Sequence, residues 1–197
     1  MGMTLSNYRL PPHNCHRDRK ILLIGLDSSG KTSLLYRLHL STFGQFIPTI
    51  GFNVEIIHPP FSEDHLVIWD ISGQSIQLWR HYLLHNEALI FMVDSTDYAR
   101  IGEAKEALWS VWQHDDMAET GLLLVYANKQ DRPNAMTVRE VMEALDIENL
   151  VRTTCAVTGA VGSAGRRRRR WHIQGSSTLL DDGVWEGIEW LCAQIQD

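Results

Sequence analysis

The chain has 197 residues, enough for one domain with little left for a second, and 44% of them are hydrophobic, which suits a packed core. The formal net charge of −6 argues against a nucleic-acid partner, and no apolar run approaches the roughly 18 residues of a membrane span or resembles a secretory signal. The three cysteines, Cys15, Cys155 and Cys192, match no metal-ligand spacing, so we expect a soluble protein of the reducing cytosol.

Short apolar runs alternate with helical patterns along the chain. The runs predict strands over 21–25, 52–58, 65–70, 88–94, 122–129 and 171–175. Helical spacing of apolar residues predicts helices over 31–40, 101–112, 137–146 and 184–195. Thr137 and Glu140 have the spacing of a capping box. Strands alternating with helices predict an α/β fold with a mostly parallel sheet covered on both faces, in which 52–58 and 65–70 form an antiparallel pair.

A glycine-rich segment, GLDSSGKT at residues 25–32, lies between the first strand and the first helix and fits the pattern G-x-x-x-x-G-K-[ST]. Its two glycines allow backbone angles at which successive N–H groups converge on phosphates, and the helix adds its positive N-terminal end. Lys31 is expected to reach the β- and γ-phosphate oxygens, and the Thr32 hydroxyl to ligate Mg²⁺. The alternative is an ordinary glycine turn with a solvated lysine. The predicted phosphate-binding residues are Gly25, Leu26, Asp27, Ser28, Ser29, Gly30, Lys31, Thr32 and Ser33.

A polar turn, Asn128-Lys129-Gln130-Asp131, follows the strand predicted over 122–129. The Asp131 carboxylate can accept from both the ring N–H and the exocyclic amine of guanine, a pair of donors that adenine lacks. Asn128 can donate to the carbonyl side of guanine, and the stem of Lys129 can lie over the base plane. Taken alone, the segment fits an ordinary turn equally well. Combined with the phosphate loop, it predicts that GTP and GDP are the ligands.

Two further segments supply candidate contacts to the γ-phosphate and the metal. Asp70 ends a predicted strand and can hold Mg²⁺ through a water, while the Gly73 N–H can bond a γ-phosphate. Thr49 can close over the metal and the γ-phosphate from the other side. Gln74 follows Gly73 at a position where its amide could orient an attacking water. A glutamine in a polar loop is often only solvated, so its role depends on the neighbouring motif. The predicted catalytic residues are Gln74, Lys31 and Thr49.

Together these motifs resemble the Ras-superfamily GTPases, and within them the Arf and Arf-like branch. The branch is indicated by GLDSSGKT, PTIGFNVE (48–55), WDISGQ (69–74), LWRHY (78–82), VDSTD (93–97), ANKQD (127–131) and WHIQG (171–175). The resemblance covers nearly all of residues 20–195. It implies the P-loop GTPase fold, with a six-stranded, mostly parallel sheet containing one antiparallel strand. It also implies a GTP/GDP and Mg²⁺ cycle, an exchange factor, a GTPase-activating protein and effector proteins.

The sequence departs from the family pattern at several positions. Ser72 stands where the branch has a glycine, and the segment between Gln74 and Leu78 is about two residues shorter. The guanine-contacting C-A-T motif is replaced by residues 176–179, and we assign its role to Ser177 and Thr178 rather than to the similar TCAVTG at 154–159. Residues 151–170 resemble a flexible insertion of about sixteen residues.

The insertion ends in five arginines, Arg166 to Arg170. Between Asp146 and Trp171 the sequence is rich in Gly, Ala and Thr, and we expect a loop there. The arginines could contact an anionic membrane, or serve as a nuclear-localisation or RNA-contacting patch. We expect a solvated charge run.

The N-terminus fits the myristoylation pattern M-G-x-x-x-[ST], with Gly2 as the acceptor of the lipid. One myristoyl chain binds membranes only marginally, so a second signal is needed. Cys15 could carry one, although we expect an unmodified thiol. We therefore expect an N-terminal extension over 1–19, a GTPase domain over 20–197, and a cytoplasmic protein with peripheral association with Golgi or other intracellular membranes.

The leading functional prediction is an Arf-like molecular switch, a monomer that hydrolyses GTP slowly and recruits effectors in intracellular membrane traffic and protein transport. The alternative is a GTP-binding interaction module with little or no hydrolysis, because Ser72 and the shortened segment after Gln74 alter the second switch. A metabolic kinase using the same phosphate loop is disfavoured, since ANKQD and PTIG would have no role in it.

Overall fold

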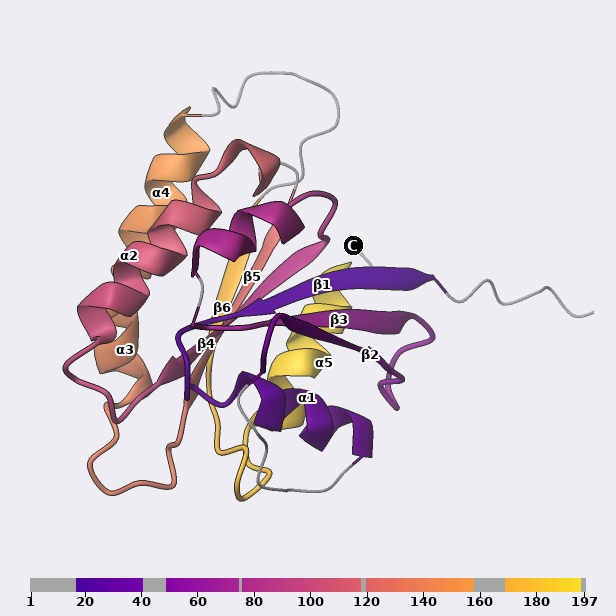
Figure 1. Ribbon diagram of the computed structural model, residues 1–197, viewed down its shortest axis with the longest axis horizontal. Helices are drawn as coiled ribbons and strands as arrows, with labels where there is room; N and C mark the ends of the chain where they lie inside the picture. The colour runs from indigo at the N-terminus through magenta and orange to yellow at the C-terminus, as the bar shows by residue number, and fades with distance from the viewer. Residues whose placement is uncertain (1–16, 41–48, 75, 118–119, 158–168, 196–197) are drawn as a thin grey trace, which may run out of the picture.

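A six-stranded sheet organises the chain in the computed structural model, which describes residues 17–40, 49–74, 76–117, 120–157 and 169–195 (Figure 1). The strands are β1 (Asp18–Ile24), β2 (Phe52–Ile57), β3 (His65–Ile71), β4 (Ala88–Asp94), β5 (Leu122–Asn128) and β6 (Arg170–Gly175). The α-helices among the described residues are α1 (Lys31–Leu40), α2 (Ile101–Trp112), α3 (Val138–Leu145), α4 (Ile147–Val157) and α5 (Val184–Ile195). Two 3₁₀ segments, η1 (Ile76–Tyr82) and η2 (Asp115–Met117), also occur in the described ranges.

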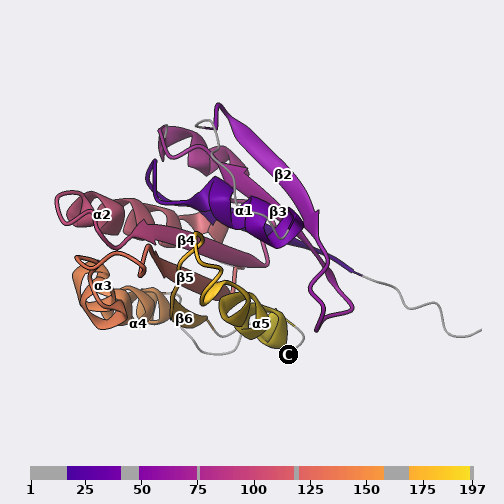
Figure 2. The same ribbon diagram turned by 90° about the horizontal axis from the view of Figure 1, so that it is seen from below.

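The strand order is β2-β3-β1-β4-β5-β6. Strand β2 pairs with β3 in the antiparallel sense, and all other neighbouring strands in the sheet are parallel. Helices α1 and α5 cover one face, and α2, α3 and α4 with η1 cover the other (Figures 1 and 2). The predicted fold class and the antiparallel pair are confirmed. No helix among the described residues combines the length and apolar character needed to cross a bilayer.

Both faces of the central strands are buried, which explains why their sequences are continuous apolar runs rather than alternating ones. In β1, Leu22 and Ile24 face the α2 side of the sheet, while Ile21 and Leu23 face α1 and α5. Strand β5 is buried along its entire length. Because the parallel strands end at the same edge, the loops that follow β1, β3, β4 and β5 lie along one edge of the sheet.

The N-terminal boundary of the sheet differs from the expected start of the domain at residue 20. Strand β1 begins at Asp18, so the last two residues of the expected extension belong to the sheet. These two residues are polar, so the apolar pattern of the strand does not include them. Ion pairs hold Arg19 in place, with nitrogen–oxygen distances of 2.7 Å to Asp64 and 2.8 Å to Glu87. Residues 1–16, which include Gly2 and Cys15, lie outside the described part of the chain.

The loop expected between Asp146 and Trp171 is wrong over residues 147–157, because α4 runs from Ile147 to Val157. Its buried face follows from Ile147 and Leu150, which are fully buried against the α2 side of the sheet. Helix α3 has the predicted capping box at Thr137, and Asp146 in a left-handed conformation (φ 54°) separates the two helices. The apolar residues within 147–151 have helical spacing, which indicates this helix, but the Gly- and Ala-rich residues that follow them favour a loop. Residues 158–168 are outside the described chain, as are three of the five arginines.

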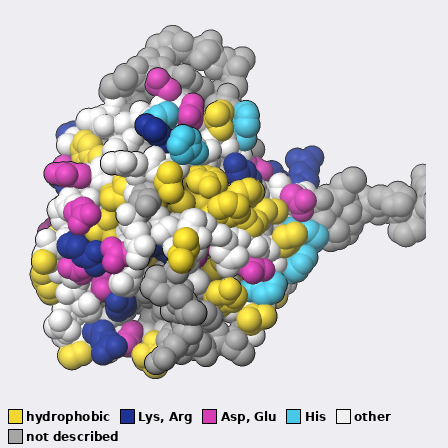
Figure 3. Space-filling view, in the orientation of Figure 1, with side chains coloured by type: hydrophobic (Ala, Val, Ile, Leu, Met, Phe, Trp, Pro, Cys, Tyr) yellow, Lys and Arg dark blue, Asp and Glu magenta, His cyan; other side chains and the backbone are white. Residues whose placement is uncertain are grey.

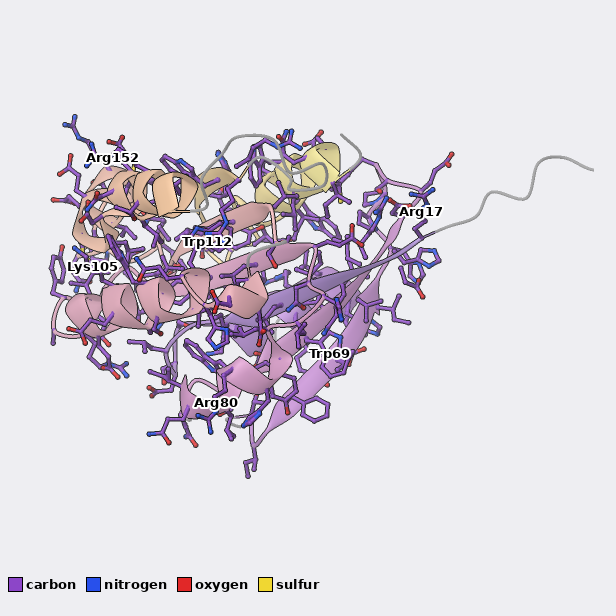
Figure 4. All side chains as sticks on the ribbon, turned by 90° about the horizontal axis from the view of Figure 1, so that it is seen from above. Arg17, Trp69, Arg80, Lys105, Trp112 and Arg152 are labelled. Carbon is purple, nitrogen blue, oxygen red and sulfur yellow. The ribbon has the colours of Figure 1, made fainter. Side chains whose placement is uncertain are left out.

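The last two arginines of the run are not a solvated charge run. The Arg169 guanidinium lies 4.5 Å from the ring centroid of Trp112, which is labelled in Figure 4, and donates to the carbonyls of Trp112 and Met117 at 3.1 and 2.9 Å. Arg170 begins β6, and its backbone N–H donates to the Gly121 carbonyl at 2.7 Å. These contacts attach the start of β6 to the end of α2.

Replacing Arg169 with alanine is expected to lower the free energy of unfolding by about 2 kcal/mol, because it removes a cation–π contact and two charge-assisted hydrogen bonds. Denaturant unfolding with and without the substitution measures this change. Arg152→Ala is the matched control, since Arg152 is an exposed helical arginine that donates to Asn149 three residues earlier. Equal stability of the Arg169→Ala variant and the wild-type protein would contradict this role.

Candidate functional site

An open cleft lies at the carboxyl ends of β1 and β3. It is lined by the glycine-rich segment, by the residues just before β2 and by the residues just after β3. The lining residues are Asp27, Ser28, Gly30, Lys31, Thr32, Ser33, Thr49, Ser72, Gly73 and Gln74. All of these except Ser72 were among the predicted site residues. Gly25, Leu26 and Ser29 complete the same loop between β1 and α1. The structure therefore brings the predicted phosphate and γ-phosphate contacts together around one cleft.

The glycine-rich loop needs glycine where it bends most closely around its neighbours. Gly30 has φ 102°, a left-handed conformation that side chains rarely adopt. A Cβ atom at this position would lie 2.3 Å from the Asn128 amide nitrogen. Ser28 also has a positive φ of 61°. The loop thus packs its backbone directly against the end of β5.

The Lys31 ammonium lies inside this loop. It is buried and donates to the carbonyls of Gly25 and Leu26 at 2.9 and 2.7 Å. Burial lowers the pKa of Lys31 to about 8, against the opposing effect of the Asp70 and Asp27 carboxylates. A buried cation at the N-terminus of α1 favours a strongly anionic ligand such as a phosphate chain.

This pKa predicts proton uptake when a phosphate-bearing ligand binds. Phosphate charge favours the ammonium form, so the bound state holds more protons than the free state at pH values above about 8. Affinity is therefore expected to fall as the pH rises above that value. Titration calorimetry of GDP at about pH 9, in buffers of different ionisation enthalpy, is expected to show uptake approaching one proton. The uptake should shrink near pH 7, and none at about pH 9 would contradict this prediction.

Three oxygen-bearing side chains converge beside Lys31. The Thr32 hydroxyl donates to Oδ2 of Asp70 at 2.6 Å and lies 2.7 Å from the Thr49 hydroxyl, which itself lies 3.5 Å from that carboxylate oxygen. Burial raises the pKa of Asp70, while hydrogen bonds from Thr32 and Thr49 and the charge of Lys31 act in the opposite direction. Oδ1 of Asp70 is buried and has no hydrogen-bond partner within the described chain. Two hydroxyls and one carboxylate with an unsatisfied oxygen fit Mg²⁺, which prefers oxygen ligands and retains several waters.

The segment after β3 is fixed against the glycine-rich loop. Trp79, fully buried in η1, donates its indole N–H to the Ser72 carbonyl at 2.9 Å. A Cβ atom at Gly73 would lie 2.3 Å from the Asp27 backbone nitrogen, so only glycine allows this close approach. The Ser72 hydroxyl accepts from the Gln74 backbone N–H at 3.4 Å. The Gln74 side chain is exposed at the rim of the cleft.

A second group of predicted residues gathers where β5 ends. The Asn128 amide donates to the Ser29 carbonyl at 2.8 Å, and Oδ1 of Asn128 accepts from the Thr178 backbone N–H at 3.2 Å. The Ser177 hydroxyl donates to Oδ1 of Asp131 at 2.6 Å. The segment 177–178 thus lies beside Asn128 and Asp131, whereas residues 154–157 of the competing TCAVTG continue α4.

Asp94, to which the sequence motifs assign no role, orients Lys129. The Lys129 ammonium donates to Oδ2 of Asp94, and Thr96 donates to Oδ1 through both its backbone N–H and its hydroxyl. Burial acts to raise the pKa of Asp94, but the bonds from Lys129 and Thr96 outweigh it and lower the pKa. Asp94 pairs in register with Asn128, so its place at the end of the neighbouring strand was the available signal.

The sequence motifs also do not indicate the ion pairs that join the glycine-rich loop to the start of α2. Arg100, at the start of α2, donates to Asp27 and Asp97 at 2.7 and 2.6 Å. All three side chains are partly exposed. The guanidinium is therefore held between two carboxylates, one of which lines the cleft.

Comparison with known proteins relates the chain to one protein family. The model of the ADP-ribosylation factor family matches residues 8–195 of the chain. Among solved structures, the chain is similar to the Arl6 (BBS3) small GTPase from Trypanosoma brucei, determined with the bound nucleotide analogue GppNp. The two share 27% sequence identity with a TM-score of 0.74, and the match covers 91% of this chain and 98% of the other.

Proposed function

The chain belongs to the ADP-ribosylation factor family of small GTPases, and we propose that the residues gathered at its cleft bind GTP or GDP with Mg²⁺ and hydrolyse GTP slowly in a switch that acts in intracellular membrane traffic. As a member of this family it is a GTP hydrolase that cycles between GTP- and GDP-bound states under exchange factors and GTPase-activating proteins and binds effectors.

The observation that carries the proposal is the convergence of Lys31, Thr32, Thr49 and Asp70. Lys31 and the backbone of residues 25–33 would hold the phosphates, and Thr32 and Thr49 would ligate Mg²⁺, with Asp70 acting through a water. The unsatisfied oxygen of Asp70 supports this set, because burial of a carboxylate oxygen without a partner is costly. When bound, Mg²⁺ supplies positive charge that compensates the phosphates.

The residues at the end of β5 support guanine as the base. Asp131 would accept from the two donors of guanine, Asn128 would contact the carbonyl side, and Lys129 would lie along the base plane. Lys129 is held for this by Asp94, and the Ser177 hydroxyl fixes one oxygen of Asp131. Ser177 and Thr178 contribute the loop that faces these side chains.

Hydrolysis would depend on Gln74, whose exposed amide lies at the rim of the cleft and can orient a water. No arginine is among the cleft-lining residues in the described part of the chain, and Arg100 is already paired with Asp27 and Asp97. We therefore propose slow intrinsic turnover that a GTPase-activating protein raises. An interaction module without hydrolysis is the second candidate, favoured by the buried Ser72 hydroxyl, which bonds the Gln74 backbone.

Effectors would bind an aromatic surface next to the cleft, formed by Phe52, Trp69 and Tyr82. The Phe52 ring centroid lies 5.5 Å from that of Trp69 and 5.7 Å from that of Tyr82. Phe52 is 50% exposed, and Figure 3 shows hydrophobic side chains gathered on this face. Figure 4 labels Trp69, which β3 carries. Strands β2 and β3 lie between Thr49 and Gln74 in the chain, and η1 follows Gln74. A change at the γ-phosphate contacts would therefore reach this surface directly.

Membrane association would come from the N-terminus. Gly2 is the proposed myristoylation site, and a cytoplasmic monomer with peripheral binding to Golgi or other intracellular membranes is the proposed state. Mass spectrometry of the protein from a eukaryotic host would detect the lipid, and an unmodified Gly2 there would contradict the proposal.

Binding of fluorescent GTP and GDP to the purified protein, with Mg²⁺ or with a chelator, tests the nucleotide assignment directly. We expect Mg²⁺-dependent binding that excess ATP does not displace. Displacement by ATP as effective as by GTP would show that the base assignment is wrong.

Replacing Thr32 with asparagine is expected to lower the affinity for GTP at least about tenfold, or roughly 1.4 kcal/mol, because the amide cannot replace the hydroxyl at the metal. GDP binding should be affected less, so the variant favours a GDP-bound or nucleotide-free form. The matched control is Thr153→Asn, since the Thr153 hydroxyl bonds only backbone carbonyls of α4 among the contacts described. Wild-type GTP loading and Mg²⁺ dependence in the Thr32→Asn variant would contradict the metal assignment.

A further inference from the structure

Helix α1 joins the two halves of the site. Its first residues, Lys31 and Thr32, lie at the cleft, and Arg37, near its C-terminal end, lies beside the loop that follows β6. The Arg37 side chain is only 11% exposed, although arginine is usually solvated. Such a position requires that its donors be satisfied by the protein.

The guanidinium of Arg37 is aimed at the backbone of the loop that contains Ser177 and Thr178. Nε and Nη2 donate to the Thr178 carbonyl at 3.2 and 3.0 Å, and Nη2 also donates to the Leu179 carbonyl at 2.9 Å. The Asp181 carboxylate lies 3.6 Å from Nε. The planar guanidinium can donate hydrogen bonds to two successive carbonyls, which a lysine ammonium cannot do with the same geometry.

The opposite side of this loop carries the proposed base contacts. The Thr178 backbone N–H donates to Oδ1 of Asn128, and the Ser177 hydroxyl donates to Asp131. A backbone pair between Ser177 and Asp182, with distances of 2.8 and 3.2 Å, closes the loop on itself. Because a peptide unit is planar, a bond that fixes the Thr178 carbonyl also fixes the direction of the Leu179 N–H on the other side.

We propose that Arg37 is a positioning residue for guanine recognition, which holds the loop 177–182 against α1 and thereby slows release of the nucleotide. The inference rests on the proposed assignment of the guanine site. Arg37 acts through the loop and is not among the residues that line the cleft in the described part of the chain, so its effect would be confined to ligands that carry the base. Arg37 also attaches the loop 177–182 to α1, whose N-terminus would receive the phosphates. The distance between the proposed base contacts and the proposed phosphate contacts is thereby held constant.

Replacing Arg37 with alanine is expected to speed the release of fluorescent GDP by about tenfold to a hundredfold, because charge-assisted hydrogen bonds to the loop are lost. Affinity for inorganic tripolyphosphate with Mg²⁺, measured by competition with fluorescent GDP, is expected to remain unchanged, since that ligand has no base. Arg139→Ala is the matched control, because Arg139 is an exposed helical arginine paired with Glu143. It should leave both quantities at wild-type values.

Arg37→Lys preserves the charge but not the planar guanidinium, and its release rate is expected to lie between those of the wild type and the alanine variant. If Arg37→Ala does not fold, the lysine variant decides, with faster GDP release at unchanged tripolyphosphate affinity as the supporting result. Wild-type release rates, or a parallel loss of GDP and tripolyphosphate binding, would overturn the proposal. Failure of the wild-type protein to bind GDP would instead refute the proposed function, so the two failures are distinguishable.

Discussion

Replacing Asp131 with asparagine is expected to lower the affinity for GTP by about a hundredfold to ten-thousandfold. The carboxylate would accept two hydrogen bonds from guanine, and bonds to a charged group contribute roughly 1.5–3 kcal/mol each. The amide of asparagine would instead place a donor opposite a donor of guanine. Xanthine carries a carbonyl in place of the exocyclic amine, so the variant should prefer xanthine nucleotides. The preference for guanine would thus be inverted by a change of one functional group.

Competition of GTP and XTP against a fluorescent nucleotide measures this inversion. Asp115→Asn is the matched control, because Asp115 is exposed on η2 and no residue of the cleft lies on that element. The control should bind GTP as the wild type does. Unchanged GTP preference in the Asp131→Asn variant would remove Asp131 from the base site.

Replacing Gln74 with leucine is expected to reduce the hydrolysis stimulated by an activating protein by about a hundredfold while GTP binding persists. Phosphoryl transfer requires a positioned water and compensated charge more than covalent chemistry from the protein, and a misplaced reactant alone costs about two orders of magnitude. Gln74 is at the cleft, but its side chain is exposed, so its placement for catalysis depends on the partner. Intrinsic hydrolysis should be very slow in both proteins.

Single-turnover phosphate release, with and without an activating protein, measures both rates. Gln113→Leu is the control, since Gln113 is an exposed glutamine at the end of α2. Ser72→Gly is expected to raise the stimulated rate if the hydroxyl that bonds the Gln74 backbone restrains that residue. Brisk hydrolysis by the isolated protein, insensitive to Gln74→Leu, would show that the catalytic assignment is wrong.

The sequence predicted most of the sheet because its central strands are buried on both faces. Strands β4 and β5 are apolar up to their last residues, Asp94 and Asn128, and α2 and α5 begin and end where the periodicity places them. Helix α4 was missed because only its first turns carry an apolar pattern, and the composition beyond them resembles a loop. The place of Arg169 depends on Trp112, more than fifty residues away in sequence, which no local pattern encodes.

The residues of the site likewise include some that the sequence predicts and some that it does not. Residues 25–33 were predictable because they are contiguous in sequence and their motif is typical of a phosphate-binding loop. Arg37 and Arg100 were not predictable, because each acts on a partner brought close by the fold. Asp94 carries one signal in the sequence, its place at the end of a predicted strand, but its contact with Lys129 also depends on the fold. The choice of Ser177 and Thr178 over TCAVTG rested on the strand that precedes them, and the structure places this pair beside Asn128 and Asp131.

The buried pair of Lys31 and Asp70 makes the folded state dependent on its ligand. Burial disfavours the charged form of both groups, and one oxygen of Asp70 has no partner within the described chain. A ligand that satisfies them adds RT ln(1 + [L]/Kd) to stability, which is about 2.7 kcal/mol at a hundredfold excess over Kd. The ligand-free protein is then the least stable member of the cycle, and the protein that catalyses exchange must also protect it from unfolding. Cellular nucleotide concentration would in this way set the lifetime of the protein as well as its signalling state.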